Sequence, residues 1–109
     1  MNIKIGPQNY VVEQRSRQND GMLNDGSYGY TLDTGNIIII DKDIAKSKQQ
    51  VTLLHEILHA IRFNNDILPK PKKKDEFDDW EHYFIGLYEG NLLAVLKDNP
   101  ELVEWLTVE

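Results

Sequence analysis

The sequence predicts an α+β fold, because segments typical of β-strands come first and segments typical of helices follow. Short apolar runs separated by turn signals fill the first 43 residues, and longer helical patterns fill the rest. The chain has 109 residues, which suits one domain around one core. We therefore expect a single domain over residues 1–109, with a small, mostly antiparallel N-terminal sheet followed by C-terminal helices.

Four short segments of the first part are typical of strands. Residues 3–5 and 10–12 are separated by Gly-Pro, and residues 28–32 and 36–40 are joined by Asp-Thr-Gly, a hairpin signal. Four successive isoleucines in the last of these strands predict that it is covered on both faces and lies inside the sheet. Residues 16–27 are polar and contain two Asp-Gly pairs, so we expect a loop there.

The first helix of the second part should begin beside Ser47. This serine and Gln50, three residues later, form a capping-box pattern. The helix should run to about Phe63, where the pair Asn64-Asn65 can supply a left-handed stop. Because this segment is apolar almost all round, we expect a helix buried in the core.

Two further helices should follow a connector that contains two prolines. Asp75 can cap a helix that continues to about Asp98, and Asn99-Pro100 is typical of the start of a short last helix. The order of strands and helices therefore favours a sheet covered by C-terminal helices.

Composition excludes several classes of protein. The net charge of −6 argues against a general binder of nucleic acid or anionic membranes, since both need a basic surface. The chain has no cysteine, which excludes disulfides and thiolate metal sites. No segment has the roughly 20 apolar residues of a membrane helix, and the N-terminus lacks the pattern of a signal peptide. We expect a cytoplasmic protein.

The central helix contains the sequence LLHEILHAI, which carries the strongest chemical signal. His55 and His59 are four residues apart, so both lie on one face of a helix and can bind one Zn²⁺. Glu56 lies roughly 100° around the helix from His55. It can reach a water on the open side of the metal and act as general base. The alternative is a chance match with two structural histidines, but burying such groups without a role costs free energy.

A hydrolytic zinc site normally has three protein ligands, so a third must come from elsewhere in the chain. On a helical wheel that starts at Phe77, Glu81 falls at about 40°, inside the apolar face, while His82 falls at about 140°, on its flank. An acid in an apolar face is typical of a metal ligand. We therefore expect Glu81 as the third ligand, with His82 as the rival.

These motifs resemble the zincin metallopeptidases, and among them the small ImmA/IrrE-type proteins common on phages and mobile elements. The resemblance rests on GNIIIID, TLLHEILHAI and LLAVLKDNP, which fall within residues 28–105. It implies a minimal zincin-like fold, zinc on His55 and His59, Glu56 as general base, and an acidic downstream ligand that maps to Glu81. It also implies a protein substrate that is a repressor or another regulator.

A departure from the family pattern keeps the third ligand open. The usual downstream glutamate followed by Ala-Asn is not found around Glu81. The segment WEHYF is also similar to the SprT-like group, whose third ligand is a histidine, which favours His82. The leading hypothesis is a phage or prophage zinc metallopeptidase that cleaves a cytoplasmic protein in a bacterial host. The alternative is a non-catalytic binding module with the same fold.

The strand at residues 28–32 is the expected platform for the substrate. Peptides bind by strand addition to an edge that has free backbone groups. Gly29 weakens an inner strand but permits close approach of another backbone, so this strand should lie at the edge, beside the cleft. Gly29 and Tyr30 are therefore the candidate substrate-binding residues, and a β-bulge at Gly29 is the alternative.

Overall fold

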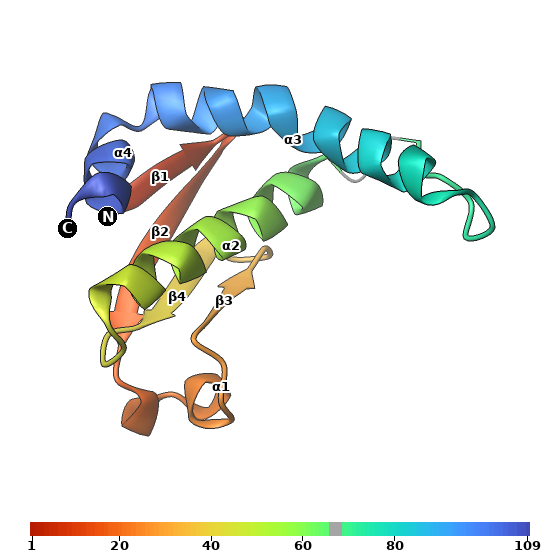
Figure 1. Cartoon of the computed structure of the whole chain (residues 1–109). Coiled ribbons are helices and arrows are strands. Elements are labelled where there is room, and N and C mark those ends of the chain that lie inside the picture. Colours follow the sequence, from red (N-terminus) through yellow and green to blue (C-terminus); the bar gives the residue numbers. More distant parts are fainter. Residues whose placement is uncertain (66–68) are drawn as a thin grey trace.

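The computed structural model describes residues 1–65 and 69–109 and confirms the α+β class, with strands first and helices after (Figure 1). None of the helices in these two ranges has both the length and the apolar character that a membrane span requires. The elements in chain order are β1 (Asn2–Ile5), β2 (Gln8–Arg15), the 3₁₀ helix η1 (Arg17–Asn19), α1 (Gly21–Asn24), β3 (Gly29–Leu32), β4 (Ile37–Asp41), α2 (Lys46–Asn64), α3 (Phe77–Asp98) and α4 (Pro100–Thr107).

The four strands form one sheet in the order β1-β2-β4-β3. The outer pairs, β1 with β2 and β3 with β4, are antiparallel, and the hairpin of β3 and β4 was predicted. The central pair is parallel and was not predicted; its register runs from Val11 opposite Ile37 to Arg15 opposite Asp41. A parallel pair needs a crossover connection. Here the chain between β2 and β4 supplies it and contains η1, α1 and β3.

The prediction that the isoleucine strand is interior and residues 28–32 lie at the edge is confirmed. β4 lies between β2 and β3, and β3 pairs with β4 alone. Ile38, Ile39 and Ile40 are at most 1% exposed. Ile38 and Ile40 belong to the main core cluster, whereas Ile39 and Leu23 are buried outside it. Because side chains alternate along a strand, α1 and its loop cover the second face of β4.

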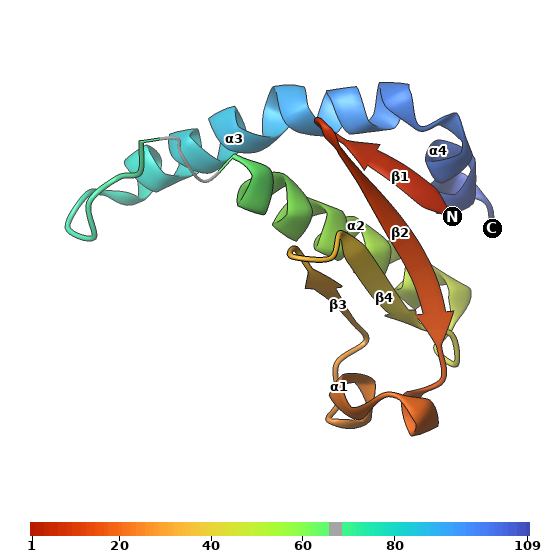
Figure 2. The ribbon, with the colours of Figure 1, turned by 180° about the vertical axis from the view of Figure 1, so that it is seen from behind.

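Helices α2, α3 and α4 cover one face of the sheet, and the main core lies between them and the strands (Figures 1 and 2). The two chain termini lie at the same end, where α4 is beside β1 (Figure 2). Apolar burial of this kind contributes roughly 25 cal/mol per Å². The buried members of the core cluster come from three strands and three helices: Ile3, Ile5, Tyr10, Ile38, Ile40, Leu53, Ile57, Ala60, Ile61, Val95 and Leu102.

Both predicted ends of α2 differ from the structure. The helix begins at Lys46 after Ala45, so Ser47 lies inside the first turn and the capping-box prediction is wrong. At the other end Asn65 has φ −125°, so no left-handed stop is formed. Instead, the Asn65 side-chain amide donates to the carbonyl of Ile61 at 2.8 Å. This bond satisfies a carbonyl that a left-handed residue would otherwise help to satisfy.

The starts of α3 and α4 agree more closely with the prediction. α3 begins at Phe77 after Glu76, and Asp75 instead accepts a hydrogen bond from the backbone of Lys72 at 2.7 Å. α4 begins at Pro100, as expected. The side chain of Asn99 does not cap α4; it bonds to both backbone groups of Lys4 at 2.8 Å. Asn99 therefore ties the junction of the last two helices to strand β1.

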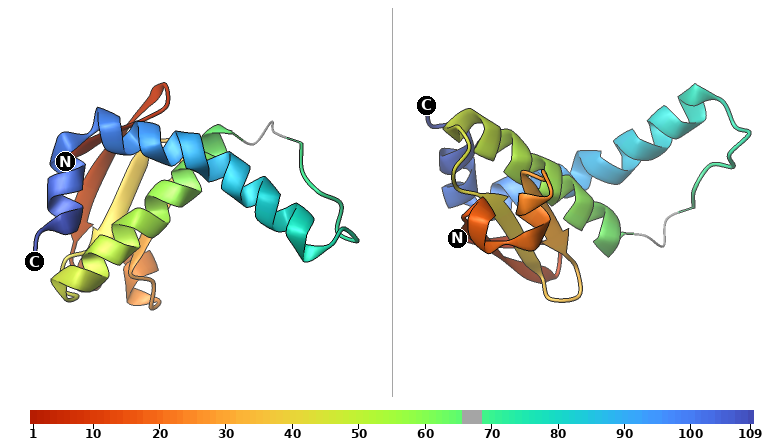
Figure 3. Two further views of the ribbon diagram at one scale, coloured as in Figure 1. Left: turned by 45° about the horizontal axis from the view of Figure 1, so that its top comes forward. Right: turned by 90° about the horizontal axis from the view of Figure 1, so that it is seen from below.

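The apolar face of α3 is covered only in its C-terminal half, which corrects the helical-wheel prediction. Leu87 and Val95 are 1% and 2% exposed, whereas Phe77 and Phe84 are 76% and 42% exposed. A 22-residue helix is about 33 Å long. Both views of Figure 3 show its N-terminal half extending beyond the C-terminal end of α2. The wheel identified the apolar side correctly, but no element in residues 1–65 and 69–109 buries that side at Phe77.

Candidate functional site

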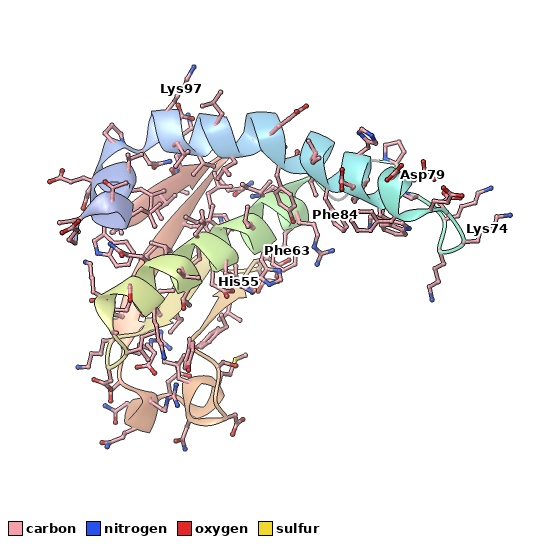
Figure 4. The ribbon with its side chains drawn as sticks, in the orientation of Figure 1. His55, Phe63, Lys74, Asp79, Phe84 and Lys97 are labelled. Atoms are coloured by element: carbon pink, nitrogen blue, oxygen red, sulfur yellow. The ribbon has the colours of Figure 1, made fainter. Side chains whose placement is uncertain are left out.

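The two histidines of the central motif lie on the exposed face of α2. The side chain of His55 is 65% exposed, while Leu53 and Ile57 on the opposite face are fully buried. Val51, one turn before His55, is 70% exposed. The prediction of a helix buried all round is therefore wrong: α2 is amphipathic and presents His55 and His59 at the surface. His55 and Phe63 leave α2 toward the same side (Figure 4).

The ring nitrogens of the histidine pair converge, as the spacing predicts. The Nε2 atoms of His55 and His59 are 3.1 Å apart, and the ring centroids are 4.8 Å apart. Phe63 stacks on His59 from the next turn, with the ring centroids 6.1 Å apart. This contact limits the positions that the His59 ring can take. Two imidazole nitrogens that point to one place can share a proton or hold one metal ion.

Glu56 lies on the side of α2 that faces β3 and, unlike the histidines, is buried. The residue is 5% exposed. Its Oε1 accepts a hydrogen bond from the hydroxyl of Thr31 at 2.9 Å, and its Oε2 lies 3.9 Å from Nε2 of His55. The carboxylate therefore approaches the histidine pair from the side, from the layer between helix and sheet.

Two hollows flank His55 and Glu56 along the line where α2 meets β3. Their volumes are about 330 Å³ and about 290 Å³. Both are lined by Gly29, His55 and Glu56, so three residues singled out from the sequence meet at one place. The larger hollow continues toward the start of α2, and its remaining lining residues are Ser27, Tyr28, Val51 and Thr52. The smaller one continues toward Phe63, and its remaining lining residues are Tyr30, Thr31, His59 and Phe63.

Gly29 is required by the close packing of β3 on α2. A Cβ atom there would lie 2.7 Å from the carbonyl oxygen of Ile39 and 2.7 Å from Cγ2 of Thr52. The pairing of Gly29 with Ile40 continues through β3 with one residue opposite one, so the alternative of a bulge is wrong. In the structure, the groups that approach Gly29 closely are the backbone of the neighbouring strand β4 and the Thr52 side chain of α2. A substrate contact at Gly29 stays a prediction.

Gly29→Ala should therefore destabilise the fold. The added methyl has to displace backbone, which costs about 1–3 kcal/mol in a packed core. Gly29→Ala combined with Thr52→Ser should recover part of this loss, because serine lacks the Cγ2 atom that the methyl meets. Chemical denaturation of the single and double variants measures both effects. A Gly29→Ala protein as stable as the wild type would contradict the packing described here.

Tyr30 points to the other face of the sheet. Gly29 and Thr31 face α2, so the residue between them faces away from it. The Tyr30 hydroxyl donates to Oδ2 of Asp20 at 2.6 Å, and Arg15 donates to the same carboxylate oxygen at 3.2 Å. The hydrogen bond from Tyr30 is the main reason that the pKa of Asp20 lies below its usual value. Burial, followed by the bond to Asp20, raises the pKa of Tyr30.

The Tyr30 side chain therefore secures the loop under the sheet and is directed away from the histidine pair. Asp20 also caps α1 by accepting from the backbone of Met22 and Leu23. Only the edge-strand position of Tyr30 keeps it among the residues that line the second hollow. A role of Tyr30 in substrate binding stays a prediction.

The two candidate third ligands, Glu81 and His82, are both exposed on the projecting half of α3. In residues 1–65 and 69–109, no three side chains of His, Cys, Asp or Glu come together as one metal-binding group. Two histidines converge, with Glu56 beside His55, and the choice between Glu81 and His82 as the third ligand stays a prediction.

The third ligand can be assigned by substitution. If Glu81 completes the site, Glu81→Ala should lower zinc affinity by at least about tenfold, the effect typical of losing a group that supports a metal site. His82→Ala should then change the affinity less than twofold, because it loses no donor. Competition titration with a chromophoric chelator measures both. The reverse order would assign the ligand to His82, as in the SprT-like pattern.

The sequence analysis missed Thr31, which bonds directly to Glu56. The only signal for it is the alternation of β3, which places residues 29 and 31 on the same face. Comparison of the chain with family models, with curated proteins and with solved structures found no match. The functional argument therefore rests on the geometry between α2 and β3.

Proposed function

We propose that this protein is a zinc-dependent metallopeptidase that hydrolyses a peptide bond in another protein. One observation carries the proposal: two histidine nitrogens converge to 3.1 Å on an exposed helix face, and a buried carboxylate oxygen lies 3.9 Å from one of them. This arrangement supports two metal donors and one general base beside a hollow on either side.

The donor set of the site fits zinc. Imidazole nitrogens bind Zn²⁺ at about 2.0–2.1 Å, and two such ligands of a tetrahedral ion are about 3.3 Å apart. The observed separation of 3.1 Å between the Nε2 atoms is close to this value. Both rings are accessible from solvent, so an ion can enter without unfolding α2. When bound, zinc makes a coordinated water more acidic and polarises a carbonyl group.

The residues of the chain divide the remaining work. His55 and His59 hold the ion, and Phe63 restrains the His59 ring. Oε2 of Glu56 accepts the proton of the attacking water and passes it to the nitrogen of the leaving amine. Because the carboxylate is held between α2 and β3, it is positioned before a substrate arrives.

The open edge of β3 supports binding of the substrate as an extended strand. The backbone N–H of Asp41 donates to the carbonyl of Tyr28 at 2.9 Å, so the backbone of Tyr28 faces β4. Backbone groups alternate in an antiparallel pair, so the N–H and C=O groups of Gly29 and Thr31 point away from β4. They can bind a peptide backbone beside the histidine pair, with side chains entering the two hollows.

The proposal also includes the origin and location that the resemblance implies. These are a gene of phage or prophage type, the cytoplasm of a bacterial host, and a regulatory protein as substrate. The alternative, a binding module without catalysis, predicts the same partner class but no cleaved product.

The proposal is tested by a search for new protein ends. A peptide library prepared from a bacterial proteome is incubated with the zinc-loaded chain, and mass spectrometry identifies newly formed N-termini. We expect cleavages with the wild type that disappear after chelation and return with added zinc. They should also be missing from the His55→Ala/His59→Ala variant. A set of ends that is the same for both proteins would refute the proposed activity.

A further inference from the structure

We infer that Thr31 is a positioning residue for Glu56: its hydroxyl holds one oxygen of the carboxylate so that the other is directed toward the histidine pair. The inference rests on the proposed function, because it concerns how the general base of that site is oriented. The inference gives edge strand β3 a second role, the orientation of the Glu56 carboxylate, in addition to the proposed binding of the substrate backbone.

The contact between Thr31 and Glu56 is direct and specific. The Thr31 hydroxyl donates to Oε1 of Glu56 at 2.9 Å and also lies 3.4 Å from the backbone carbonyl of the same residue. Oε1 therefore has a fixed donor in a layer where Glu56 is only 5% exposed. A charge-assisted bond in such a place is stronger than one in water.

The bond makes the two oxygens of the carboxylate unequal. Oε1 is engaged by Thr31, whereas Oε2 lies 3.9 Å from Nε2 of His55, beyond hydrogen-bond distance. That oxygen keeps its lone pairs for a water placed beside the histidine pair. Rotation of the carboxylate would exchange the two oxygens or withdraw both, and the Thr31 bond opposes this rotation.

Thr31 is itself held by the packing of β3. It pairs with Ile38 in the interior strand, so its place along the sheet is fixed by register. Gly29 lets the strand approach α2 to within van der Waals contact of Thr52, which brings residue 31 within reach of Glu56. The glycine and the threonine therefore act together. Gly29 permits the short distance between strand and helix, and Thr31 donates its hydrogen bond to Glu56 across that distance.

This arrangement links the base to the substrate platform. The backbone groups of Thr31 point to the open edge of β3, while its side chain points to Glu56. A peptide that pairs with this edge is thereby placed in register with the carboxylate that acts on it. Correct register contributes to rate, since a misplacement of 1 Å can cost about 10²-fold.

The experiment uses three variants of the full chain. Thr31→Val removes the hydroxyl at nearly constant volume, and Thr31→Ser keeps it. Thr107→Val is the matched control, because the exposed Thr107 hydroxyl donates within α4, to the carbonyl of Val103 at 2.8 Å, and does not bond to Glu56. Two measurements are made: the ¹³C resonance of the Glu56 carboxyl group at fixed pH, and steady-state cleavage of a peptide found in the library search.

We expect Thr31→Val to shift the Glu56 resonance and to lower kcat by about 10–100-fold, with KM and zinc affinity changed less than about twofold. Thr31→Ser should restore kcat to within about threefold, and Thr107→Val should change neither measurement. An unchanged kcat in Thr31→Val, or equal losses in Thr31→Val and Thr107→Val, would overturn the positioning role.

The resonance separates this inference from the proposed function. If the wild type cleaves nothing but Thr31→Val alone shifts the Glu56 signal, the hydrogen bond stands and both the enzyme and the positioning role in catalysis are refuted. If the wild type is active and the signal is the same in all variants, the proposed function stands and the inference about Thr31 is refuted.

Discussion

Replacing both His55 and His59 with alanine should abolish zinc binding. The wild type should retain about one Zn²⁺ per chain after dialysis, because two converging imidazoles supply two of the ligands that such a site needs. The double variant should retain essentially none. Both side chains are exposed, so the free energy of unfolding of the metal-free protein should change by no more than about 0.5 kcal/mol. Metal analysis and denaturation of the same samples measure both quantities.

Val51→Ala is the matched control for this loss. Val51 lies one turn before His55 on the same helix and is 70% exposed. Its substitution therefore changes the same helix face without removing a metal donor. It should retain zinc at the level of the wild type. Acidification should release zinc from the wild type, because protons compete for the same ring nitrogens. Equal zinc content in the wild type and the double histidine variant would show that α2 holds no such site.

The convergence of the two histidines was predictable because it depends on helix geometry alone. Residues four apart lie on one face, and in the structure the Nε2 atoms are 3.1 Å apart. Their exposure was not predictable from the same segment. Val51 and Leu54 made α2 look apolar all round, yet they are 70% and 37% exposed. An apolar residue count does not reveal which side of a helix has no covering element.

The same limit explains the prediction for α3. A helical wheel gives the direction of each side chain, and it correctly grouped Phe84 and Val95 on one side. It contains no information about where the neighbouring strands and α2 end. Val95 is covered and 2% exposed, whereas Phe84 lies beyond that cover and is 42% exposed. The position of Glu81 on that side therefore did not guarantee a place beside the histidines.

Contacts between distant segments were the least predictable features. The roles of Gly29 and Thr31 depend on the register of β3 against β4 and on its distance from α2, which only the folded chain sets. The edge position of β3 was predictable, because glycine is unfavourable in an inner strand, whereas the four isoleucines of β4 are typical of an inner strand. Ser47 failed as a cap because α2 begins one residue before it, at Lys46.

A Glu56→Gln variant should lose turnover while keeping its fold and its zinc. Glutamine has nearly the same shape, and its side-chain oxygen can still accept the hydrogen bond from Thr31 that Oε1 of Glu56 accepts at 2.9 Å. It cannot take a proton from water. General base catalysis contributes about 10²–10⁴-fold, so kcat should fall by that factor. Metal analysis, circular dichroism and peptide cleavage on one preparation give the three measurements.

The control for this loss is Glu89→Gln, which makes the same chemical change on an exposed part of α3 and should leave kcat unchanged. Together the two variants separate an enzyme from a binding module. In an enzyme the carboxylate between Thr31 and His55 should matter for turnover, because its Oε2 lies 3.9 Å from a histidine nitrogen. If Glu56→Gln cleaves as fast as the wild type, Glu56 is not the base. A wild type that binds its partner but yields no product would favour the binding module.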